Sequence, residues 1–226
     1  MLIAAAAVLG VVAGTCTGYL VQADREPTAL PSPAQPVLTQ EKGQAPAPLS
    51  AAQDRRVKTD GDLRKLLLKK PRGAKDDEFL MGDDGWMRLA DYASMFEDPD
   101  ETFGELLADE FRRAAVTGWS KGDTSVEIRL VQYRQEEVPA AADYAEGAQY
   151  WTESEDGVDS WDIPGTGGGM AYVYTRPDSE PGYLPVYRAE AHAWRGDIHM
   201  EIWVTDTERI SKKEILGLAE RQMERL

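Results

Sequence analysis

The sequence predicts an α+β fold: a twisted antiparallel sheet of β-hairpins covered by helices, preceded by an N-terminal transmembrane helix and a Pro-rich linker. Three observations predict it. An uncharged apolar run opens the chain, two Gly-Asp turns are each flanked by strands of alternating side chains, and helical periodicities surround those strands. Antiparallel hairpins mixed with helices in this way are typical of one α+β domain.

The first element is the apolar run Leu2–Val21, twenty residues without a charge. As a helix it would rise about 30 Å, the thickness of a bilayer core. We expect residues 1–21 to be a signal-anchor helix that crosses the cell membrane once, with the C-terminal domain extracytoplasmic. Two alternatives stay open. One is a cleaved secretory signal, and the other is a lipoprotein signal in which Cys16, the one cysteine, is lipidated.

Residues 22–53 are rich in proline and contain no aromatic side chain. Such a segment buries too little apolar surface to offset its chain entropy, so we expect a disordered linker. Proline favours extended conformations at about 3.1 Å per residue, which suits a spacer that holds a domain away from a membrane.

Residues 54–72 reverse the charge of the chain. They carry a net charge of +5, whereas residues 73–226 carry −19. Leu63, Leu66 and Leu67 at helical spacing predict a basic amphipathic helix that ends before Pro71. Its cations are candidates for binding lipid or another anionic surface: Arg55, Arg56, Lys58, Arg64, Lys65, Lys69 and Lys70. The alternatives are docking on the acidic domain of the same chain, and a solvated helix whose leucines pack on that domain.

Residues 73–226 form the predicted acidic α+β extracytoplasmic domain. Met87–Phe96 shows helical spacing and begins it. A second helix starts at Asp98, with Pro99 in the first helical position and Glu101 completing a capping-box-like start.

Two hairpins follow from the turns Gly122-Asp123 and Gly196-Asp197. The first pairs Trp119 with Val126, Thr117 with Ile128 and Ala115 with Leu130, and leaves Glu127 and Arg129 pointing outward. The second pairs Ala193 with Met200 on one face. On its other face it pairs three polar or aromatic residues with three more: Trp194 with His199, His192 with Glu201, and Glu190 with Trp203.

Three further elements complete the domain. Ala140–Trp151 is predicted to be a helix that crosses between the hairpins, and Met170–Thr175 a strand. Ser211–Leu226 is the last helix, because Ser211 with Glu214 forms a capping box and Ile210 with Ile215 forms a hydrophobic staple.

The apolar start, the proline tether and the segment AAQDRRVKTDGDLRKLLL (residues 51–68) appear in that order. The order of these three segments resembles that of an uncharacterised actinobacterial family of single-pass membrane-anchored, or lipoprotein-like, proteins with an extracytoplasmic α+β domain. The resemblance covers nearly the whole chain. It implies a location in the cell envelope and no chemistry.

The second hairpin supplies the candidate binding site: His192, Trp194, His199, Glu201 and Trp203. Cross-strand neighbours lie about 5 Å apart, so His192 and Glu201 can form a His–carboxylate pair for acid–base chemistry or simply face solvent as an ion pair. The tryptophans are either core or an exposed patch that binds a partner. The tripeptide Arg195–Asp197 and the Gly-rich segment 165–169 are explained by a turn and a flexible loop, and the acidic residues of 153–162 by a solvated loop.

Composition narrows the function. One cysteine excludes an intramolecular disulfide, two histidines exclude a multi-His metal centre, and no motif implies a cofactor. The net charge of −15 repels nucleic acid. We therefore expect a binding, sensor or scaffold module rather than an enzyme. Its partners are the membrane, through the N-terminal helix, and a protein or cell-wall ligand. The alternatives are an envelope hydrolase using a His–carboxylate pair, and a structural subunit of a membrane assembly.

Overall fold

The computed structural model describes residues 61–135 and 138–226, together with the isolated Thr15, Tyr19 and Ala23. The chain divides into two compact units, residues 1–46 and 47–226. In the first unit only those three isolated residues are described, each in helical conformation. The second unit contains all the strands and helices discussed below.

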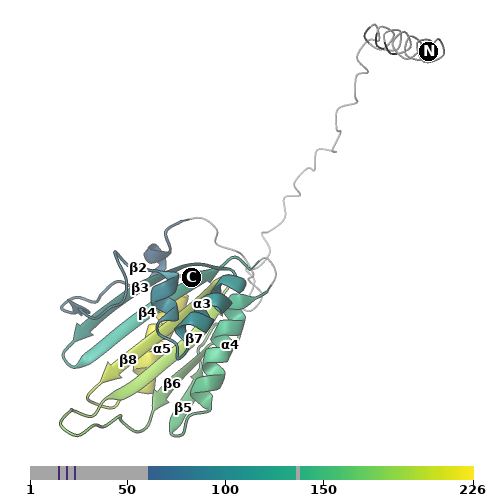
Figure 1. Ribbon diagram of the computed structural model, residues 1–226. Coiled ribbons are helices and arrows are strands. Elements are labelled where there is room, and N and C mark those ends of the chain that lie inside the picture. Colours follow the sequence, from purple (N-terminus) through teal and green to yellow (C-terminus); the bar gives the residue numbers. More distant parts are fainter. Residues whose placement is uncertain (1–14, 16–18, 20–22, 24–60, 136–137) are drawn as a thin grey trace, which may run out of the picture. The chain divides into compact units, whose positions relative to one another are not determined.

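Eight antiparallel strands form one sheet (Figure 1), in the order β1-β3-β4-β8-β7-β6-β5, with β2 paired to β3 beside β1. Their bounds are β1 Lys75–Asp76, β2 Trp86–Met87, β3 Phe111–Lys121, β4 Thr124–Tyr133, β5 Val158–Asp162, β6 Met170–Tyr174, β7 Tyr187–Arg195 and β8 Ile198–Asp206. Both predicted hairpins, β3–β4 and β7–β8, are present in the predicted register, including Trp119 opposite Val126 and His192 opposite Glu201. The two hairpins also pair with each other through β4 and β8, so they form the centre of the sheet.

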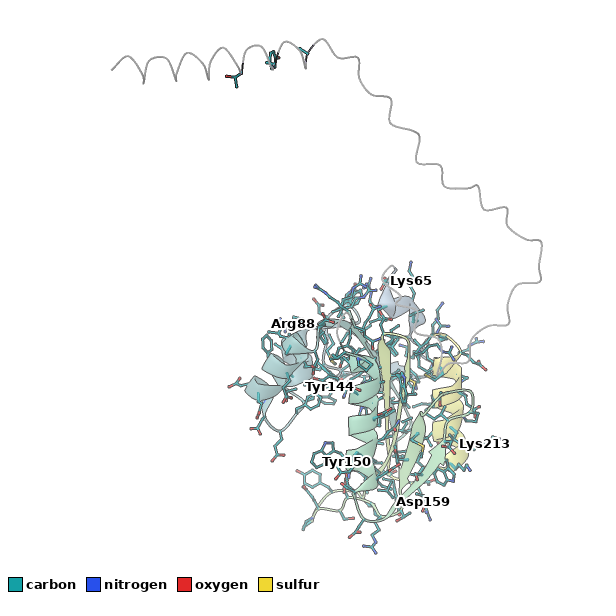
Figure 2. The ribbon with its side chains drawn as sticks, turned by 90° about the vertical axis from the view of Figure 1, so that its right-hand side faces the viewer. Lys65, Arg88, Tyr144, Tyr150, Asp159 and Lys213 are labelled. Carbon is teal, nitrogen blue, oxygen red and sulfur yellow. The ribbon has the colours of Figure 1, made fainter. Side chains whose placement is uncertain are left out.

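The helices lie on both faces of this sheet. They are α2 Leu89–Ala93, α3 Pro99–Ala108, α4 Ala140–Glu153 and α5 Lys212–Met223, with a four-residue 3-10 helix, η1, at Leu63–Leu66. Helix α4 contacts β4, β7 and β8, and α5 contacts β6, β7 and β8 from the other side. Figure 2 shows the sheet between α4 and α5.

Each sheet face has its own core, because successive side chains of a strand point to opposite faces. On the α5 face, Ile128, Met200 and Ile202 pack with Ile215 and Ala219. The other core lies under α2, α3 and α4, and combines small apolar residues with buried tyrosines: Met87, Tyr92, Ala93, Leu106, Ala114, Val116, Val131, Tyr133, Ala140 and Ala141.

The predicted fold class needs correction. Among the described residues, no helix is both long and apolar enough to cross a membrane. The predicted transmembrane segment, Leu2–Val21, and the predicted linker, residues 22–53, lie almost wholly outside the described residues. The helices also cover both faces of the sheet, so the outward positions predicted for Glu127 and Arg129 are wrong. Their side chains are only 22% and 13% exposed.

The local signals gave mixed results. Ser211 caps α5 as predicted, by accepting a hydrogen bond from the Glu214 amide. Asp98 occupies the N-cap of α3 but makes no side-chain capping bond. The predicted helix 87–96 is confined to Leu89–Ala93, because Met87 pairs with β3 as part of β2. Residues 158–162, expected to be a loop, form β5.

Within its described residues 61–72, the basic segment forms only the short η1, capped by Asp62. Leu63 and Leu67 are buried in the core on the α5 face. Gln222 of α5 holds the segment in place: its side-chain amide accepts from the Leu68 N–H at 2.9 Å and donates to the Leu66 carbonyl at 2.9 Å. The leucines therefore pack on the domain, which is one of the alternatives predicted for residues 54–72.

Candidate functional site

A row of polar side chains lies on the face of the β7–β8 hairpin that α4 covers. Glu190 and His192 come from β7, and His199 and Glu201 from β8. The sequence places them on one face correctly, but their exposed fractions of 3%, 2%, 1% and 5% show that this face is not solvated. Buried polar groups are costly unless they find partners, so this row calls for a physical explanation.

A cleft of about 640 Å³ opens above part of this row. His199 and Glu201 lie at its floor, α2 and α3 form one wall, and α4 forms the other. Tyr144, which Figure 2 labels on α4, belongs to the second wall. The lining residues are Tyr92, Phe96, Glu105, Ala108, Asp109, Asp143, Tyr144, Gly147, Ala148, Trp151, His199 and Glu201. Among the described residues, this lining has four aromatic and four acidic side chains and no lysine or arginine.

Glu201 is the charged group at the floor. Its carboxylate accepts a hydrogen bond from the Tyr92 hydroxyl at 2.5 Å and one from the Arg129 guanidinium at 3.2 Å. Burial acts to raise the pKa of Glu201, but the neighbouring His199, the Arg129 cation and the bond from Tyr92 outweigh it and lower that pKa. Glu201 is therefore ionised at neutral pH, where the Arg129 guanidinium is its charged partner.

His199 is neutral at the same pH. Burial, helped by His192 and Arg129 against the opposing pull of Glu201, lowers its pKa from 6.5 to about 4. Neither of its ring nitrogens has a hydrogen-bond partner among the described residues. Its Nδ1 lies 3.6 Å from Glu201, beyond hydrogen-bond distance. A neutral imidazole has one donor and one acceptor nitrogen, and in His199 both are buried.

Glu190 and His192 form a second, more enclosed group beside the cleft. Glu190 accepts hydrogen bonds from the Thr152 hydroxyl at 3.1 Å and from the Tyr174 hydroxyl at 3.0 Å. The Nε2 of His192 is 3.5 Å from Glu190, and its ring is 5.8 Å from that of His199. Neither Glu190 nor His192 lines the cleft. The sequence suggested His192 and Glu201 as a pair for acid–base chemistry. The structure separates them, because Glu201 lines the cleft and His192 does not.

Stacked aromatic rings support the cleft walls. Tyr144 stacks on Tyr133 at 5.2 Å and donates a hydrogen bond to Asp109 at 3.0 Å, which links α4 to the C-cap of α3. Tyr92 contacts Phe96 edge-on at 5.3 Å. At the rim, the Trp151 side chain is 71% exposed. An indole in water beside an apolar cleft is a contact surface for a ligand.

The five predicted binding residues divide between the cleft and its support. His199 and Glu201 line the cleft. Trp203 lies under it, with His192 edge-on to its ring at 5.7 Å and Arg129 over its ring at 5.6 Å. Trp194 packs against the core on the α4 face. The two tryptophans therefore form no exposed patch.

Sequence reasoning missed the cleft walls. Tyr92, Tyr144 and Trp151 sit on helices whose place relative to the sheet depends on tertiary packing. The one signal was compositional: α4 carries an aspartate, two tyrosines and a tryptophan in fourteen residues, with its buried positions occupied mainly by alanine.

The basic residues predicted to bind an anionic surface are described only in part. Arg55, Arg56 and Lys58 lie outside the described residues. Arg64 forms ion pairs with Asp62 and Asp84, and Lys70 pairs with Asp76 at 2.6 Å. Lys65 and Lys69 are exposed. The tripeptide 195–197 cannot be read as a linear motif, because Asp197 is 0% exposed and accepts a hydrogen bond from Gln132 at 2.7 Å.

Within the part of the chain that the structure describes, no three histidine, cysteine or acidic side chains gather in a way that could hold a metal ion. A scan against protein-family models finds no match, and no curated protein matches the sequence. The resemblance to an actinobacterial anchored family therefore stays a prediction.

Among solved structures, the chain is similar to the extracellular domain of PknH from Mycobacterium tuberculosis. The two are 9% identical, and the match covers 58% of this chain and 71% of that one at a TM-score of 0.39. At that score the likeness carries no argument about function.

Proposed function

We propose that the domain is a non-enzymatic binding module, and that its ligand is an organic cation held in the cleft between α2–α3 and α4. The observation that carries the proposal is the floor of the cleft. There an ionised carboxylate, Glu201, lies beside a neutral imidazole, His199, whose nitrogens have no partner among the described residues.

The cleft fits a cation on three grounds. Its lining includes Glu105, Asp109 and Asp143 as well as Glu201, and no basic side chain. Its walls contain four aromatic side chains, and a cation over the face of such a ring gains about 0.5–2 kcal/mol. His199, which lies beside Glu201 at the floor, is neutral at pH 7 and so adds no positive charge that would repel a cation. An anion would meet repulsion from every one of the four carboxylates.

The proposal favours binding over catalysis because of where His192 lies. The hydrolase alternative needs His192 and a carboxylate to act together on a substrate. His192 does not line the cleft, whereas His199 and Glu201 do. A ligand in the cleft would therefore contact Glu201 and His199 without reaching the histidine assigned to acid–base chemistry.

The test is a titration of the full-length protein with three probes of similar size: phenethylamine, which is a cation, 2-phenylethanol, which is neutral, and phenylacetate, which is an anion. We expect phenethylamine to bind at least ten-fold more tightly than 2-phenylethanol, because a charge-assisted contact contributes about 1.5–3 kcal/mol. Phenylacetate should not bind. Equal affinity for all three probes would remove the electrostatic part of the proposal.

Gly147 offers a sharp variant. It lines the cleft, its backbone is helical, and a Cβ there would meet nothing within 4 Å. Gly147→Met should abolish phenethylamine binding while stabilising α4, since glycine is about 1 kcal/mol worse than good helix formers. The matched control is Gly104→Met on α3, another open helical glycine that does not line the cleft. Loss of binding in both variants would argue against this cleft.

Location is a separate part of the proposal. We propose that the apolar segment Leu2–Val21 directs the domain out of the cytoplasm, and that residues 22–53 act as its spacer. The support is the uncharged composition of the first segment and the proline content of the second. Labelling intact cells with a membrane-impermeant amine reagent tests it. Labelling only after lysis would place the domain in the cytoplasm.

A further inference from the structure

A second pocket, of about 460 Å³, lies on the α5 side of the sheet. It is formed by the chain after η1, the turn end of the β3–β4 hairpin, and α5. Lys213, which Figure 2 labels beside α5, is one of its residues. The lining residues are Leu68, Lys69, Pro71, Trp119, Lys121, Thr124, Val126, Ser211, Lys213, Glu214, Leu218 and Arg221.

The pocket combines an apolar floor with a basic rim. Trp119, Val126 and Leu218 are buried core residues, 5%, 4% and 8% exposed, so their accessible atoms lie at the base. The charged lining residues are four cations, Lys69, Lys121, Lys213 and Arg221, against one acid, Glu214. Lysine and arginine characteristically lay their alkyl stems along apolar surface and keep the charge at the edge.

This charge stands out against the rest of the domain. Residues 73–226 carry a net charge of −19, so a site with four basic side chains and one acidic one is not what composition alone predicts. Several other cations of the described domain are neutralised in ion pairs, for example Arg129 with Glu127 and Arg188 with Asp178. The four rim cations form no ion pair with any described carboxylate.

We infer that this pocket binds a single anionic amphiphile: an apolar chain on the floor formed by Trp119, Val126 and Leu218, and a carboxylate or phosphate head among the rim cations. A small hydrophilic anion would leave the apolar floor uncovered. A cationic amphiphile would meet four like charges. The first turn of α5 adds to the preference for an anion, because its backbone N–H groups give that end a partial positive charge.

The pocket is independent of the proposed cation cleft. The cleft lies on the other face of the sheet, under α2, α3 and α4, and the two sites share no lining residue. Either site can therefore fail its test without affecting the other.

The experiment is isothermal titration of the full-length protein with decanoate below its micelle concentration. Decyltrimethylammonium carries the same chain with the opposite charge, and inorganic phosphate carries the charge without the chain. We expect decanoate to bind at one site per chain, at least ten-fold more tightly than either control probe, and more weakly as salt rises. Equal binding of the cationic probe or of phosphate alone, or no binding of decanoate, would overturn the inference.

Two adjacent lysines provide a matched pair of variants. Lys212 and Lys213 are both exposed in the first turn of α5, but only Lys213 lines the pocket, and Lys212 lies over the Trp161 ring at 5.0 Å. Lys213→Gln combined with Arg221→Gln should weaken decanoate binding about ten-fold, because each exposed ion pair contributes up to about 1 kcal/mol. Lys212→Gln should change it less than two-fold. A loss in Lys212→Gln as large as that in Lys213→Gln alone, which removes the same charge, would mean that only net charge matters.

A last measurement distinguishes binding of a single ligand molecule from contact with a membrane surface. The protein is mixed with vesicles of neutral phosphatidylcholine, with and without anionic phosphatidylglycerol, and sedimented. Decanoate binding that Lys213→Gln with Arg221→Gln removes, together with vesicle binding that these substitutions leave unchanged, supports the pocket. Vesicle binding that Lys213→Gln with Arg221→Gln weakens, without decanoate binding, would show that the basic rim is a membrane-contact surface instead. Urea unfolding of each variant checks that it is folded. We expect all of them to be folded, because Lys212, Lys213 and Arg221 are exposed.

Discussion

The hydroxyl of Tyr92 donates a hydrogen bond to the carboxylate of Glu201 at 2.5 Å, although 109 positions separate the two residues in sequence. Tyr92 belongs to α2 and Glu201 to β8, so this bond ties a short helix to the floor of the cleft. Burial and the nearby Glu201 raise the pKa of Tyr92 well above its usual value, so the hydroxyl keeps its proton and remains a donor. Both side chains are more than nine-tenths buried.

The first prediction concerns this bond. Tyr92→Phe removes the donor and leaves a buried carboxylate oxygen with one partner fewer, which costs about 1–3 kcal/mol. We expect the free energy of unfolding to fall by that amount in urea titrations at pH 7. Tyr150→Phe is the control, because the Tyr150 side chain is 69% exposed, and its effect should be below about 0.5 kcal/mol. An unchanged stability of Tyr92→Phe would mean that the bond contributes nothing in solution.

The second prediction is a pH dependence set by His199. Its pKa is 6.5 in the unfolded chain and about 4 in the folded one, so the unfolded state binds the proton more tightly. Stability is therefore complete above pH 6.5 and falls as the pH drops toward 4. Because one pKa unit corresponds to about 1.4 kcal/mol, the loss from His199 should be about 2 kcal/mol by pH 5.

The variant His199→Gln isolates this contribution, because glutamine does not titrate. Between pH 7 and pH 5, its free energy of unfolding should fall by about 2 kcal/mol less than that of the parent. The groups near His199 that also titrate or carry charge are Glu201, His192 and Arg129, and all three are retained in the variant. Identical pH profiles of variant and parent would show that His199 is not held neutral by burial.

The third prediction is a coupling between Arg129 and Glu201. Arg129 is the cation beside the buried carboxylate, and its own side chain is 13% exposed. Arg129→Met leaves that charge uncompensated and should cost about 3–5 kcal/mol. Adding Glu201→Gln removes the orphaned charge, so the double variant should recover about 1–3 kcal/mol relative to Arg129→Met.

A solvated ion pair serves as the comparison. Arg209 pairs with Asp159 at 3.6 Å, and both side chains are more than half exposed. Arg209→Met should therefore change stability by less than about 1 kcal/mol. The geometry indicates that Arg129 and Glu201 interact between neighbouring strands. A double-variant cycle that gives no coupling energy would contradict this interaction.

The fourth prediction concerns the Gly-rich segment 165–169, which the sequence suggested was a flexible loop. A Cβ on Gly168 would lie 2.6 Å from the Trp194 ring, which packs against the core on the α4 face, so the ring or the loop would have to shift. Gly168→Ala should destabilise the domain by about 1–3 kcal/mol through overpacking. Gly147→Ala, at a helical position with open space, should instead stabilise it by up to about 1 kcal/mol. Thermal melts of the two variants should shift in opposite directions.

Local pattern was sufficient for the two central hairpins and their register. The Gly122-Asp123 and Gly196-Asp197 turns set the register of each hairpin, and a strict period of two then assigned every side chain to a face. Helix α5 followed from its cap at Ser211 and its staple, Ile210 and Ile215, both of which are buried. These are short-range effects, and a single sequence contains them.

Several elements depended on distant partners. Met87 reads as part of a helix but pairs with Ala114 in the sheet, and β5 exists because residues 158–162 find the edge of β6. The charged face of β4 reads as solvated, yet Arg129 is covered. In each case a backbone or side-chain partner that is remote in sequence outweighs the local preference.

The sequence by itself determined that His192, His199, Glu190 and Glu201 share one face of a hairpin, because alternation and turn length are local properties of the chain. Only the tertiary structure decided that this face is buried, that His199 and Glu201 become the floor of a cleft, and that His192 does not. The physical reason is that the hairpin exposes either face equally well in isolation. The packing of α2, α3 and α4 on one side and of α5 on the other fixes which polar groups lose water and which remain within reach of a ligand.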